Sequence, residues 1–365
     1  MILQLCHGYD GPFLDCARQY AQLFAGTPHP VVTVYLTGED RPEVAQASAS
    51  RAVIFMGYRS AQIRGLKLNA IRDLARIAAR HPFTLCIAHR FKPVYTALWG
   101  TKLPVIGVHH AFGDYRRFGR RLLARLFRQR LALLGVSNAV RDDLRASLPT
   151  WSPARIATLY NRVDVTTLQR AQLPRNAARQ TLDLPLDAWI VGHVGRLHPD
   201  KDQATLLRAF ALARPALPPE SLLVIVGSGR LENALKAQAA ALGIAAATRF
   251  PGQIAEARRY FRAFDCFALS SDHEPFGMVL LEAMAADVPI ICSDCGGAPE
   301  VVGETGRCFP FGNAEALGRA LIDCAAAPPD GVGVAARLHD LFSDAAVRQA
   351  FWQLPLLRDL GITSS

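Results

Sequence analysis

The sequence lacks any run of 18 apolar residues, so we expect no segment that spans a bilayer as a helix. Its start, MILQLCHGYDG, has neither the basic stretch nor the long apolar core of a secretory signal. No repeat of 20 to 50 residues and no low-complexity tract is visible. These absences lead us to expect a globular protein that works in the cytoplasm.

Motifs for phosphate loops and metal sites are missing as well. No G-x-x-x-x-G-K-[ST] pattern occurs, which argues against ATP or GTP chemistry on a P-loop. Cys292 and Cys295 form a C-x-x-C pair, but a zinc or redox site needs a second ligand pair or a thioredoxin-like context, and neither is evident. The eight cysteines are scattered along a long chain, which favours reduced thiols over a disulfide framework. We therefore expect no metal and no cofactor.

The chain is long and apolar enough for two domains, because it has 365 residues and half of them are apolar. Short β-rich apolar segments alternate with helical patterns, and the alternation restarts after a polar connection at 169–185. Such alternation is typical of doubly wound parallel sheets. The sequence thus predicts two tandem Rossmann-like α/β domains, 1–168 and 169–345. A last helix at 347–360, within the end segment 346–365, is also expected.

The expected elements can be given by their ranges. Strands are expected at 2–7, 31–36, 53–57, 84–89, 105–109, 131–137 and 156–161, and again at 189–195, 222–227, 248–252, 265–270, 288–293 and 306–310. Helices are expected near 12–25, 64–80, 114–130 and 138–147, and near 202–213, 231–242, 254–264, 276–286 and 313–326. Because ligands of open α/β sheets bind outside the carboxyl ends of the strands, we expect the site in a cleft between two facing sheets.

Residues 270–289, SSDHEPFGMVLLEAMAADVP, predict a loop that leads into a helix. Glu274 stands at the helix start and Glu282 eight positions later, so a continuous helix would separate them by roughly 12 Å along its axis and about 80° around it. A glycosidase pair needs about 5 to 9 Å, so this pair is not one. Two such carboxylates suit both ends of an elongated ligand such as a sugar nucleotide, with helix N–H groups for its phosphates. Alternatively, Glu274 only complements the helix dipole and Glu282 is an ordinary surface residue.

The segment Glu274-Pro-Phe-Gly-Met-Val-Leu-Leu-Glu282 resembles the Glu-(seven residues)-Glu signature of retaining glycosyltransferases, in particular family 4. The following VPIICSDCGGAPEVV at 288–302 is similar to that family's next strand and Gly-Gly-x-Pro-Glu turn. The resemblance extends over about residues 186 to 325. It implies the GT-B fold, in which two Rossmann-like domains face each other across a cleft and the final helix crosses back onto the first domain.

Two cations follow an expected strand that ends at Gly195. Arg196 and Lys201 resemble the family's residues that stabilise the leaving nucleotide diphosphate, and cations near a helix start suit that developing charge. A solvated Arg/Lys pair is the alternative. The G-x-G in VGSGR at 226–230 lacks the third glycine of a dinucleotide fingerprint, so we interpret it as a close approach of backbone to the nucleotide or as a simple turn.

The resemblance also implies roles around the two glutamates. Glu282 would accept hydrogen bonds from the ribose hydroxyls of the donor. Glu274 would orient the sugar, together with Gly277, Met278 and Val279 at the expected helix start. We expect the cations and the helix dipole to replace a bound metal.

In the first half, LPVIGVHHAFGDY at 103–115 places two histidines at the end of an expected strand. Family members have a histidine at this point, and counting six from Pro104 selects His110 over His109 as the residue that contacts the donor sugar. The choice between them stays open, and a structural histidine is the alternative. Gly11 is the residue that matches the family's glycine-rich loop on the acceptor side. In TLYNRVDV at 158–165, Arg162 stands where the family's domain-joining segment has glycine.

A basic segment lies between Asp114 and Asp142, which have no acidic residue between them. Its arginines are Arg116, Arg117, Arg120, Arg121, Arg125, Arg128 and Arg130. Arg117, Arg121, Arg125 and Arg128 share a helical stripe, with Leu122 and Leu126 roughly opposite. We predict that Arg116–Arg130 docks on an anionic membrane or a phosphorylated glycolipid, a solvated helix face being the alternative. Nucleic acid is not expected, because stacking aromatics and known binding motifs are missing.

Together these features predict a cytoplasmic retaining glycosyltransferase, peripheral on the inner face of the membrane. It would move a hexose or N-acetylhexosamine from a nucleotide-diphosphate sugar, UDP on family base rates, to a glycan or glycolipid such as lipopolysaccharide core. The net charge of +10 agrees with acidic partners. The rival functions are a sugar-nucleotide epimerase or phosphorylase on the same architecture and an inactive sugar-nucleotide-binding subunit. The sugar, base, acceptor, linkage and oligomeric state stay open.

Overall fold

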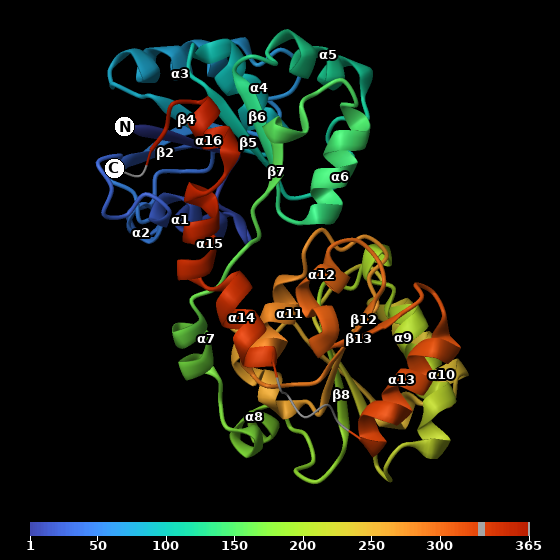
Figure 1. The fold of residues 1–365 in the computed structure, drawn as a ribbon. Coiled ribbons are helices and arrows are strands. Elements are labelled where there is room, and N and C mark those ends of the chain that lie inside the picture. The colour runs from blue at the N-terminus through green and yellow to red at the C-terminus, as the bar shows by residue number, and fades with distance from the viewer. Residues whose placement is uncertain (328–332, 364–365) are drawn as a thin grey trace. The chain divides into compact units, whose positions relative to one another are not determined.

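The computed structural model describes residues 1–327 and 333–363, which divide into two units (Figure 1). Unit 1 comprises Met1–Arg162 and Asp344–Ser365, and unit 2 comprises Val163–Ser343. The chain therefore leaves unit 1 after Arg162 and returns to it at Asp344. Within the described residues, no helix combines the length and apolar character that crossing a bilayer requires.

Unit 1 contains a seven-stranded parallel sheet in the order β3-β2-β1-β4-β5-β6-β7. Every residue of β1, β4, β5 and β6 is buried, which explains why these strands form unbroken apolar runs in the sequence. The strands are β1 (Ile2–Cys6), β2 (Val31–Thr37), β3 (Ala52–Tyr58), β4 (Leu85–His89), β5 (Val105–His109), β6 (Leu131–Gly135) and β7 (Ile156–Thr158).

Helices connect these strands, and most but not all were expected. They are α1 (Phe13–Gln22), α2 (Pro42–Ala47), α3 (Leu68–Ala79), α4 (Phe91–Gly100), α5 (Phe118–Leu126), α6 (Asn138–Ser147) and the 3-10 turn η1 (Pro153–Arg155). The prediction missed α2 and α4. Helix α4 has no polar face to give it a helical period, because Pro93, Val94, Thr96, Ala97, Leu98 and Gly100 are all buried.

The last described helices, α15 (Asp344–Trp352) and α16 (Pro355–Asp359), pack on unit 1; both are red in Figure 1, where α15 lies beside α1. Phe351 and Trp352 each meet the ring of Phe24 edge-on, with ring centroids 5.4 Å apart in both pairs. Trp352 Nε1 also donates a hydrogen bond to the carbonyl of Leu23 at 3.1 Å. The single helix expected at 347–360 is interrupted, because Pro355 starts a new helix and cannot continue the previous one.

Unit 2 contains a six-stranded parallel sheet in the order β10-β9-β8-β11-β12-β13. Its strands are β8 (Ile190–Val194), β9 (Leu222–Val226), β10 (Thr248–Gly252), β11 (Cys266–Leu269), β12 (Ile290–Ser293) and β13 (Arg307–Phe309). Its helices are α7 (Val165–Ala171), α8 (Arg175–Thr181), α9 (Gln203–Ala213), α10 (Glu232–Ala241), α11 (Met278–Ala285), α12 (Ala298–Val302), α13 (Ala314–Ala326) and α14 (Val334–Phe342). Short 3-10 turns lie at η2 (Pro199–Lys201), η3 (Arg214–Ala216), η4 (Ala245–Ala247), η5 (Ala257–Ala263) and η6 (Gly303–Thr305).

Two predictions for unit 2 were wrong in detail. The segment 169–185 was expected as a polar connection, but it contains the end of α7 and all of α8. The helix expected at 254–264 is the 3-10 turn η5. The predicted fold class of two doubly wound α/β sheets is nevertheless confirmed.

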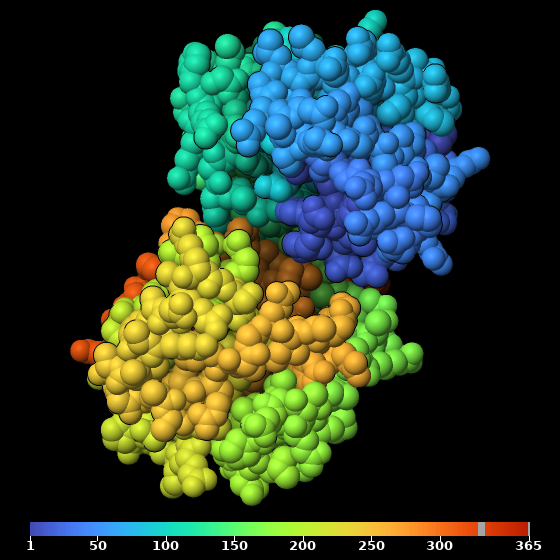
Figure 2. All heavy atoms as spheres, turned by 180° about the vertical axis from the view of Figure 1, so that it is seen from behind, coloured from blue at the N-terminus to red at the C-terminus, as the bar shows by residue number. Residues whose placement is uncertain are grey.

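The strand orders locate the place in each unit where a ligand is expected. The order reverses between β1 and β4 in unit 1 and between β8 and β11 in unit 2. Ligands of open parallel sheets bind outside the carboxyl ends of the strands at such reversal points. A ligand is therefore expected at the loops after β1 and β4 in unit 1 and at those after β8 and β11 in unit 2. Residues from the first hundred, blue to cyan, form most of the unit 1 face seen in Figure 2.

All eight cysteines are free thiols. Cys292 and Cys308 lie directly opposite each other on β12 and β13, with their sulfurs 3.8 Å apart. Among the described residues, no three His, Cys, Asp or Glu side chains are grouped so that they could hold a metal ion.

Candidate active site

The reversal point of unit 2 is marked by an ion pair between two predicted site residues. Lys201 Nζ donates to Glu274 Oε2 at 2.6 Å, although the two residues are 73 positions apart in sequence. Only 18% of the Lys201 side chain and 10% of the Glu274 side chain are exposed. Ser271 Oγ donates to the same carboxylate oxygen at 3.3 Å. The carboxylate is therefore fixed by two side-chain donors.

Backbone contacts join the loop after β11 to the connection after β8. Ser270 Oγ donates to the carbonyl of Lys201 at 2.9 Å. The Asp272 N–H donates to the carbonyl of Asp200 at 3.0 Å. These two bonds help to position Lys201 beside Glu274.

Glycines allow a third loop, between β12 and α12, to reach the same place. The Gly297 N–H donates to the Glu274 carbonyl at 2.7 Å. Gly296 has φ +64°, and a Cβ there would lie 2.2 Å from the Glu274 carbonyl oxygen. The Gly-Gly turn is thus required by a close approach of two backbones.

The two other predicted residues after β8 behave differently. Gly195 is part of the packed backbone, because a Cβ on Gly227 would lie 1.9 Å from the Gly195 carbonyl oxygen. The G-x-G at 226–230 therefore allows its backbone to pack closely against the backbone that follows β8. Arg196 has a largely exposed side chain, which pairs with Asp200 at 3.3 Å. The structure thus brings Lys201 and Glu274 together and leaves Arg196 outside their contact.

The predicted helix geometry between the two glutamates was wrong. Helix α11 begins at Met278, and Gly277 precedes it with φ +97°, a left-handed conformation that no regular helix contains. Glu274 therefore lies in the loop, and the separation worked out for one continuous helix does not apply. Glu282, Met278 and Val279 are half-buried on α11. No side chain caps the start of α11, so the N–H groups of Met278 and Val279 have no partner from the helix itself.

In unit 1, the structure gives the two candidate histidines distinct surroundings. His109 is fully buried, and its Nδ1 lies 2.6 Å from Asp114 Oδ2. His110 is partly exposed, and its Nε2 lies 3.3 Å from Nδ1 of the buried His89. His109 thus has the surroundings of a structural histidine, whereas His110 is the one a ligand can reach. Its role stays a prediction.

His110 is neutral at physiological pH. Burial, the neighbouring His109 and Arg90 lower the pKa of His110 to about 4, against a smaller opposing effect of Asp114. Burial also lowers the pKa of His89, and His110 adds to that effect. The contact between the two rings is therefore a hydrogen bond between neutral imidazoles, and His110 can exchange hydrogen bonds with a sugar hydroxyl without carrying charge.

The glycine predicted on the acceptor side, Gly11, lies in the exposed loop between β1 and α1. It has φ +60°, and a Cβ there would meet no atom within 4 Å, so its conformation rather than crowding requires glycine. The crowded glycine of this loop is Gly8, where a Cβ would lie 2.6 Å from Thr37 Oγ1. Sequence reasoning missed Gly8, although its place directly after the strand predicted at 2–7 was a usable signal.

Arg162, which stands where the family's joining segment has glycine, does not have a positive φ, so its backbone does not require glycine. Its side chain is buried, and its Nε donates to Asp344 Oδ1 at 2.5 Å. Its Nη2 donates to the carbonyl of Gln19. The two points where the chain leaves and re-enters unit 1 are thus joined by an ion pair.

The basic segment divides into structural and exposed arginines. Arg120 bonds to Asp114, Arg116 pairs with Asp143, and Arg130 donates to three backbone carbonyls. The four arginines of the predicted stripe, Arg117, Arg121, Arg125 and Arg128, are exposed, and so is Arg116 despite its ion pair. Leu123 and Ala124 form the buried face of α5, whereas Phe118, Leu122 and Leu126 are all more than half exposed. The helix thus presents an apolar ridge as well as charge.

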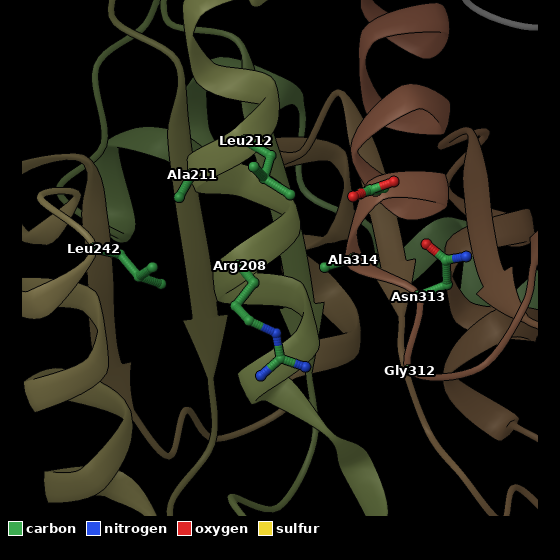
Figure 3. A pocket seen from close by; sticks show the side chains of 8 residues that line it. Arg208, Ala211, Leu212, Leu242, Gly312, Asn313 and Ala314 are labelled. Atoms are coloured by element: carbon green, nitrogen blue, oxygen red, sulfur yellow. The ribbon is translucent and has the colours of Figure 1, made fainter.

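A shallow pocket of about 620 Å³ lies elsewhere on unit 2 (Figure 3). It is lined by Arg208, Ala211 and Leu212 of α9, by Leu242, and by Gly312–Glu315 at the start of α13. None of the predicted site residues lines it. It is therefore not the site that the reversal points indicate.

The two doubly wound parallel sheets define a protein of the GT-B class. More particularly, the chain belongs to the family 4 glycosyltransferases: the family model "Glycosyltransferase Family 4" matches residues 16–167, and "Glycosyl transferases group 1" matches residues 174–329. The predicted family resemblance is confirmed.

Known relatives agree with this assignment. The chain is 35% identical over 201 residues to a D-inositol 3-phosphate glycosyltransferase of Streptomyces scabiei, covering 51% of this chain and 45% of the relative. It is 32% identical over 182 residues to the lipopolysaccharide core biosynthesis glycosyltransferase LpsE of Rhizobium meliloti, covering 48% and 52%. The matches thus span about half the length of these relatives. The structure of Anabaena HepE in complex with UDP shares the fold with TM-score 0.80 at 20% identity, over 96% of this chain and 98% of that one.

Proposed function

We propose that the protein is a retaining glycosyltransferase that takes a nucleotide-diphosphate sugar, in the first place a UDP-sugar, into the reversal-point loops of unit 2. The observation that supports this most strongly is the Lys201–Glu274 pair beside the uncapped start of α11. A cation, a fixed carboxylate and free helix N–H groups are the groups that a sugar diphosphate needs.

Each group has a distinct task in the proposed reaction. The ammonium of Lys201 uses one proton on Glu274 and keeps two for the phosphate oxygens, whose negative charge grows as the bond to the sugar breaks. The exposed Arg196 can turn towards the same diphosphate. Glu274 accepts a hydrogen bond from a sugar hydroxyl on its second oxygen, and Glu282 accepts hydrogen bonds from the ribose hydroxyls. Gly277, Met278 and Val279 bind the donor through their backbone. The departing diphosphate takes the proton of the acceptor hydroxyl.

The assignment of the two glutamates is tested with Glu274→Ala and Glu282→Ala. We expect Glu274→Ala to lower kcat by about 100-fold or more, because it removes an interaction with the reacting sugar. Glu282→Ala should mainly raise the KM for the donor, by about tenfold, because the ribose takes no part in bond breaking. Steady-state kinetics with a UDP-sugar measure both values.

The exposed Glu304→Ala in the same unit is the matched control and should leave both values unchanged. Equal changes of kcat and KM in the Glu274 and Glu282 variants would contradict the assignment. A thermal-shift screen of UDP- and GDP-sugars identifies the donor, since a ligand at about 100 times its Kd stabilises the fold by about 2.7 kcal/mol.

For the acceptor we propose a glycolipid at an anionic membrane, such as lipopolysaccharide core, as the name of the Rhizobium relative suggests for that protein. The support in this chain is α5, where exposed apolar side chains accompany exposed arginines. This combination is typical of a helix that lies in a bilayer interface, and each arginine near such a surface contributes about 1 kcal/mol.

Membrane docking is measured by co-sedimentation with vesicles. We expect binding to vesicles that contain phosphatidylglycerol and little binding to pure phosphatidylcholine, with a loss in the variant Leu122→Ser/Leu126→Ser. Leu212→Ser, an exposed leucine on unit 2, is the control. Unchanged sedimentation of the double variant would refute a role for the ridge.

A further inference from the structure

A fully buried glutamine holds the backbone at one of the two cations predicted for the donor diphosphate. Gln203 is the first residue of α9, and none of its surface is exposed. Its Nε2 donates to the carbonyl of Arg196 at 2.8 Å and lies 3.2 Å from Nε2 of His193, which is also fully buried. The side chain of Gln203 therefore reaches back from the helix and joins the loop after β8 to the strand itself.

The partners of the Gln203 amide fix the direction of each hydrogen bond around it. The carbonyl of Arg196 can only accept, so the group of Gln203 that faces it is the NH2 and not the oxygen. The second N–H then points to His193 Nε2, which must accept, so the imidazole proton lies on Nδ1. That Nδ1 donates to the carbonyl of Ala268 at 2.9 Å. A single ordered chain of bonds thus connects β11, β8 and the Arg196 carbonyl.

This arrangement requires a neutral His193. Burial lowers the pKa of His193 to about 4 and Lys201 adds to that effect, although the hydrogen bond to Ala268 opposes it. A protonated ring would turn an N–H towards the N–H of Gln203 and break the bond between them. The ring is also closely confined, since a Cβ on Gly195 would lie 3.3 Å from His193 Nε2. At neutral pH, His193 therefore stays in place as the acceptor that orients Gln203.

The amide of Gln203 is present although burying it is unfavourable. Its Oε1 atom is buried and makes no hydrogen bond within residues 1–327 and 333–363. A buried acceptor without a partner destabilises a fold, and a methionine of similar length would avoid that. A polar group kept under these conditions indicates that its N–H groups have a task.

The loop that Gln203 holds is also fixed on either side of Arg196. The N–H groups of Gly195 and Leu197 donate to carbonyls at the end of β9 and just after it, at 3.0 and 2.9 Å. The bond from Gln203 adds the carbonyl of Arg196 itself. The backbone is therefore held at three consecutive residues, whereas 72% of the Arg196 side chain is exposed. The side chain can move, but the direction in which it leaves the backbone is set.

We propose that Gln203 is a positioning residue, which aims the guanidinium of Arg196 at the donor diphosphate by holding the Arg196 carbonyl. This rests on the proposed function, in which Arg196 turns from Asp200 towards that diphosphate. A fixed origin limits how far the guanidinium can move, which lowers the entropic cost of ordering it on the phosphate oxygens. Gln203 is fully buried and acts only through Arg196.

The test is a double-mutant cycle, measured by calorimetric titration of the full chain with UDP and with GDP. Arg196→Ala should weaken the binding of whichever nucleotide the parent chain binds by about tenfold. Gln203→Met should weaken it by about fivefold, because this change misplaces the guanidinium without removing it. In the Arg196→Ala chain, adding Gln203→Met should change the affinity by less than about twofold, since no guanidinium is left to position.

Gln238→Met is the matched control. The half-buried Gln238 donates to the carbonyl of Ala204 at 2.9 Å in the same unit, and its loss should leave nucleotide affinity unchanged. The melting temperature of each variant shows whether it folds. If Gln203→Met does not fold, Gln203→Asn takes its place, because asparagine keeps the amide but withdraws it from the Arg196 carbonyl.

The proposal is overturned if Gln203→Met binds the nucleotide like the parent chain. It is also overturned if Gln203→Met weakens binding by the same factor in the Arg196→Ala chain and in the parent, since a residue that only supports the fold would do this. An Arg196→Ala chain with the affinity of the parent overturns it as well. A parent chain that binds neither UDP nor GDP refutes the proposed function itself, so the two failures are distinguishable.

Discussion

The ion pair between Lys201 and Glu274 makes a prediction that links stability to donor binding. The change is Lys201→Met, which keeps most of the side-chain volume and removes the charge. It leaves the Glu274 carboxylate mostly buried, with Ser271 as its remaining side-chain donor. Removing one member of a buried pair is costly because the other charge stays desolvated.

The magnitude follows from distance and burial. Two unit charges at this separation attract each other by about 6 kcal/mol at an effective dielectric constant near 20. The remaining exposure of both side chains and the cost of their desolvation reduce the net effect, so we expect a loss of about 3 kcal/mol in the free energy of unfolding. For a unit of this size that is a fall in Tm of about 6 to 12 °C.

Unfolding in urea, followed by circular dichroism with and without UDP-glucose, measures both effects. Lys201→Met should unfold at a lower urea concentration and lose the stabilisation by the donor. The double variant Lys201→Met/Glu274→Gln should recover stability without recovering donor binding.

Unit 2 contains a matched control for this experiment. Lys236 and Glu232 form a pair of nearly the same length, 2.7 Å, but their side chains are 49% and 35% exposed. Lys236→Met should therefore cost only about 0.5 kcal/mol. If the two lysine variants lose the same free energy of unfolding, burial does not determine the strength of the Lys201–Glu274 pair and the reasoning is refuted.

Two further predictions concern unit 2. Gly296→Ala should lower Tm by clearly more than Gly243→Ala. Both glycines have φ near +65 to +70°, but only at Gly296 would a Cβ lie against the Glu274 backbone. Similar losses of Tm would show that the backbone conformation alone requires glycine. The second concerns pH. Burial, together with Lys201, lowers the pKa of His193 to about 4, against a hydrogen bond to Ala268 that raises it. Below pH 6.5 the unfolded chain therefore binds more protons at His193 than the folded chain does. The contribution of neutral His193 to the free energy of unfolding is complete above pH 6.5 and falls by about 3 kcal/mol as the pH falls to 4. His193→Gln should flatten that pH dependence in urea unfolding, and an unchanged slope would argue against it.

The fold was largely predictable because its central strands are buried on both faces. Strands such as β1 and β5 form apolar runs that are short, regularly spaced and separated by helical patterns. What escaped prediction had no such pattern. Helix α4 is buried almost all round, and α8 lies in a segment whose polar composition resembles a loop. Local periodicity cannot identify either one.

The sequence named Lys201 and Glu274, which the structure places in contact, but it did not give the geometry of their loops. The Glu-(seven residues)-Glu spacing located Glu274 and Glu282, yet the positive φ of Gly277 separates them into loop and helix. The contact between Lys201 and Glu274 depends on how two loops meet at the edge of a sheet, which sequence spacing does not encode.

The contribution of residues 344–363 to unit 1 has a consequence for the order of events during synthesis. The aromatic side chains that cover Phe24 leave the ribosome only after all of unit 2 has been made. Until then, the nascent first unit must keep that apolar surface uncovered and leave Arg162 without Asp344. We therefore expect unit 2 to be able to complete its fold during translation, whereas unit 1 becomes complete only after residues 344–363 have been made.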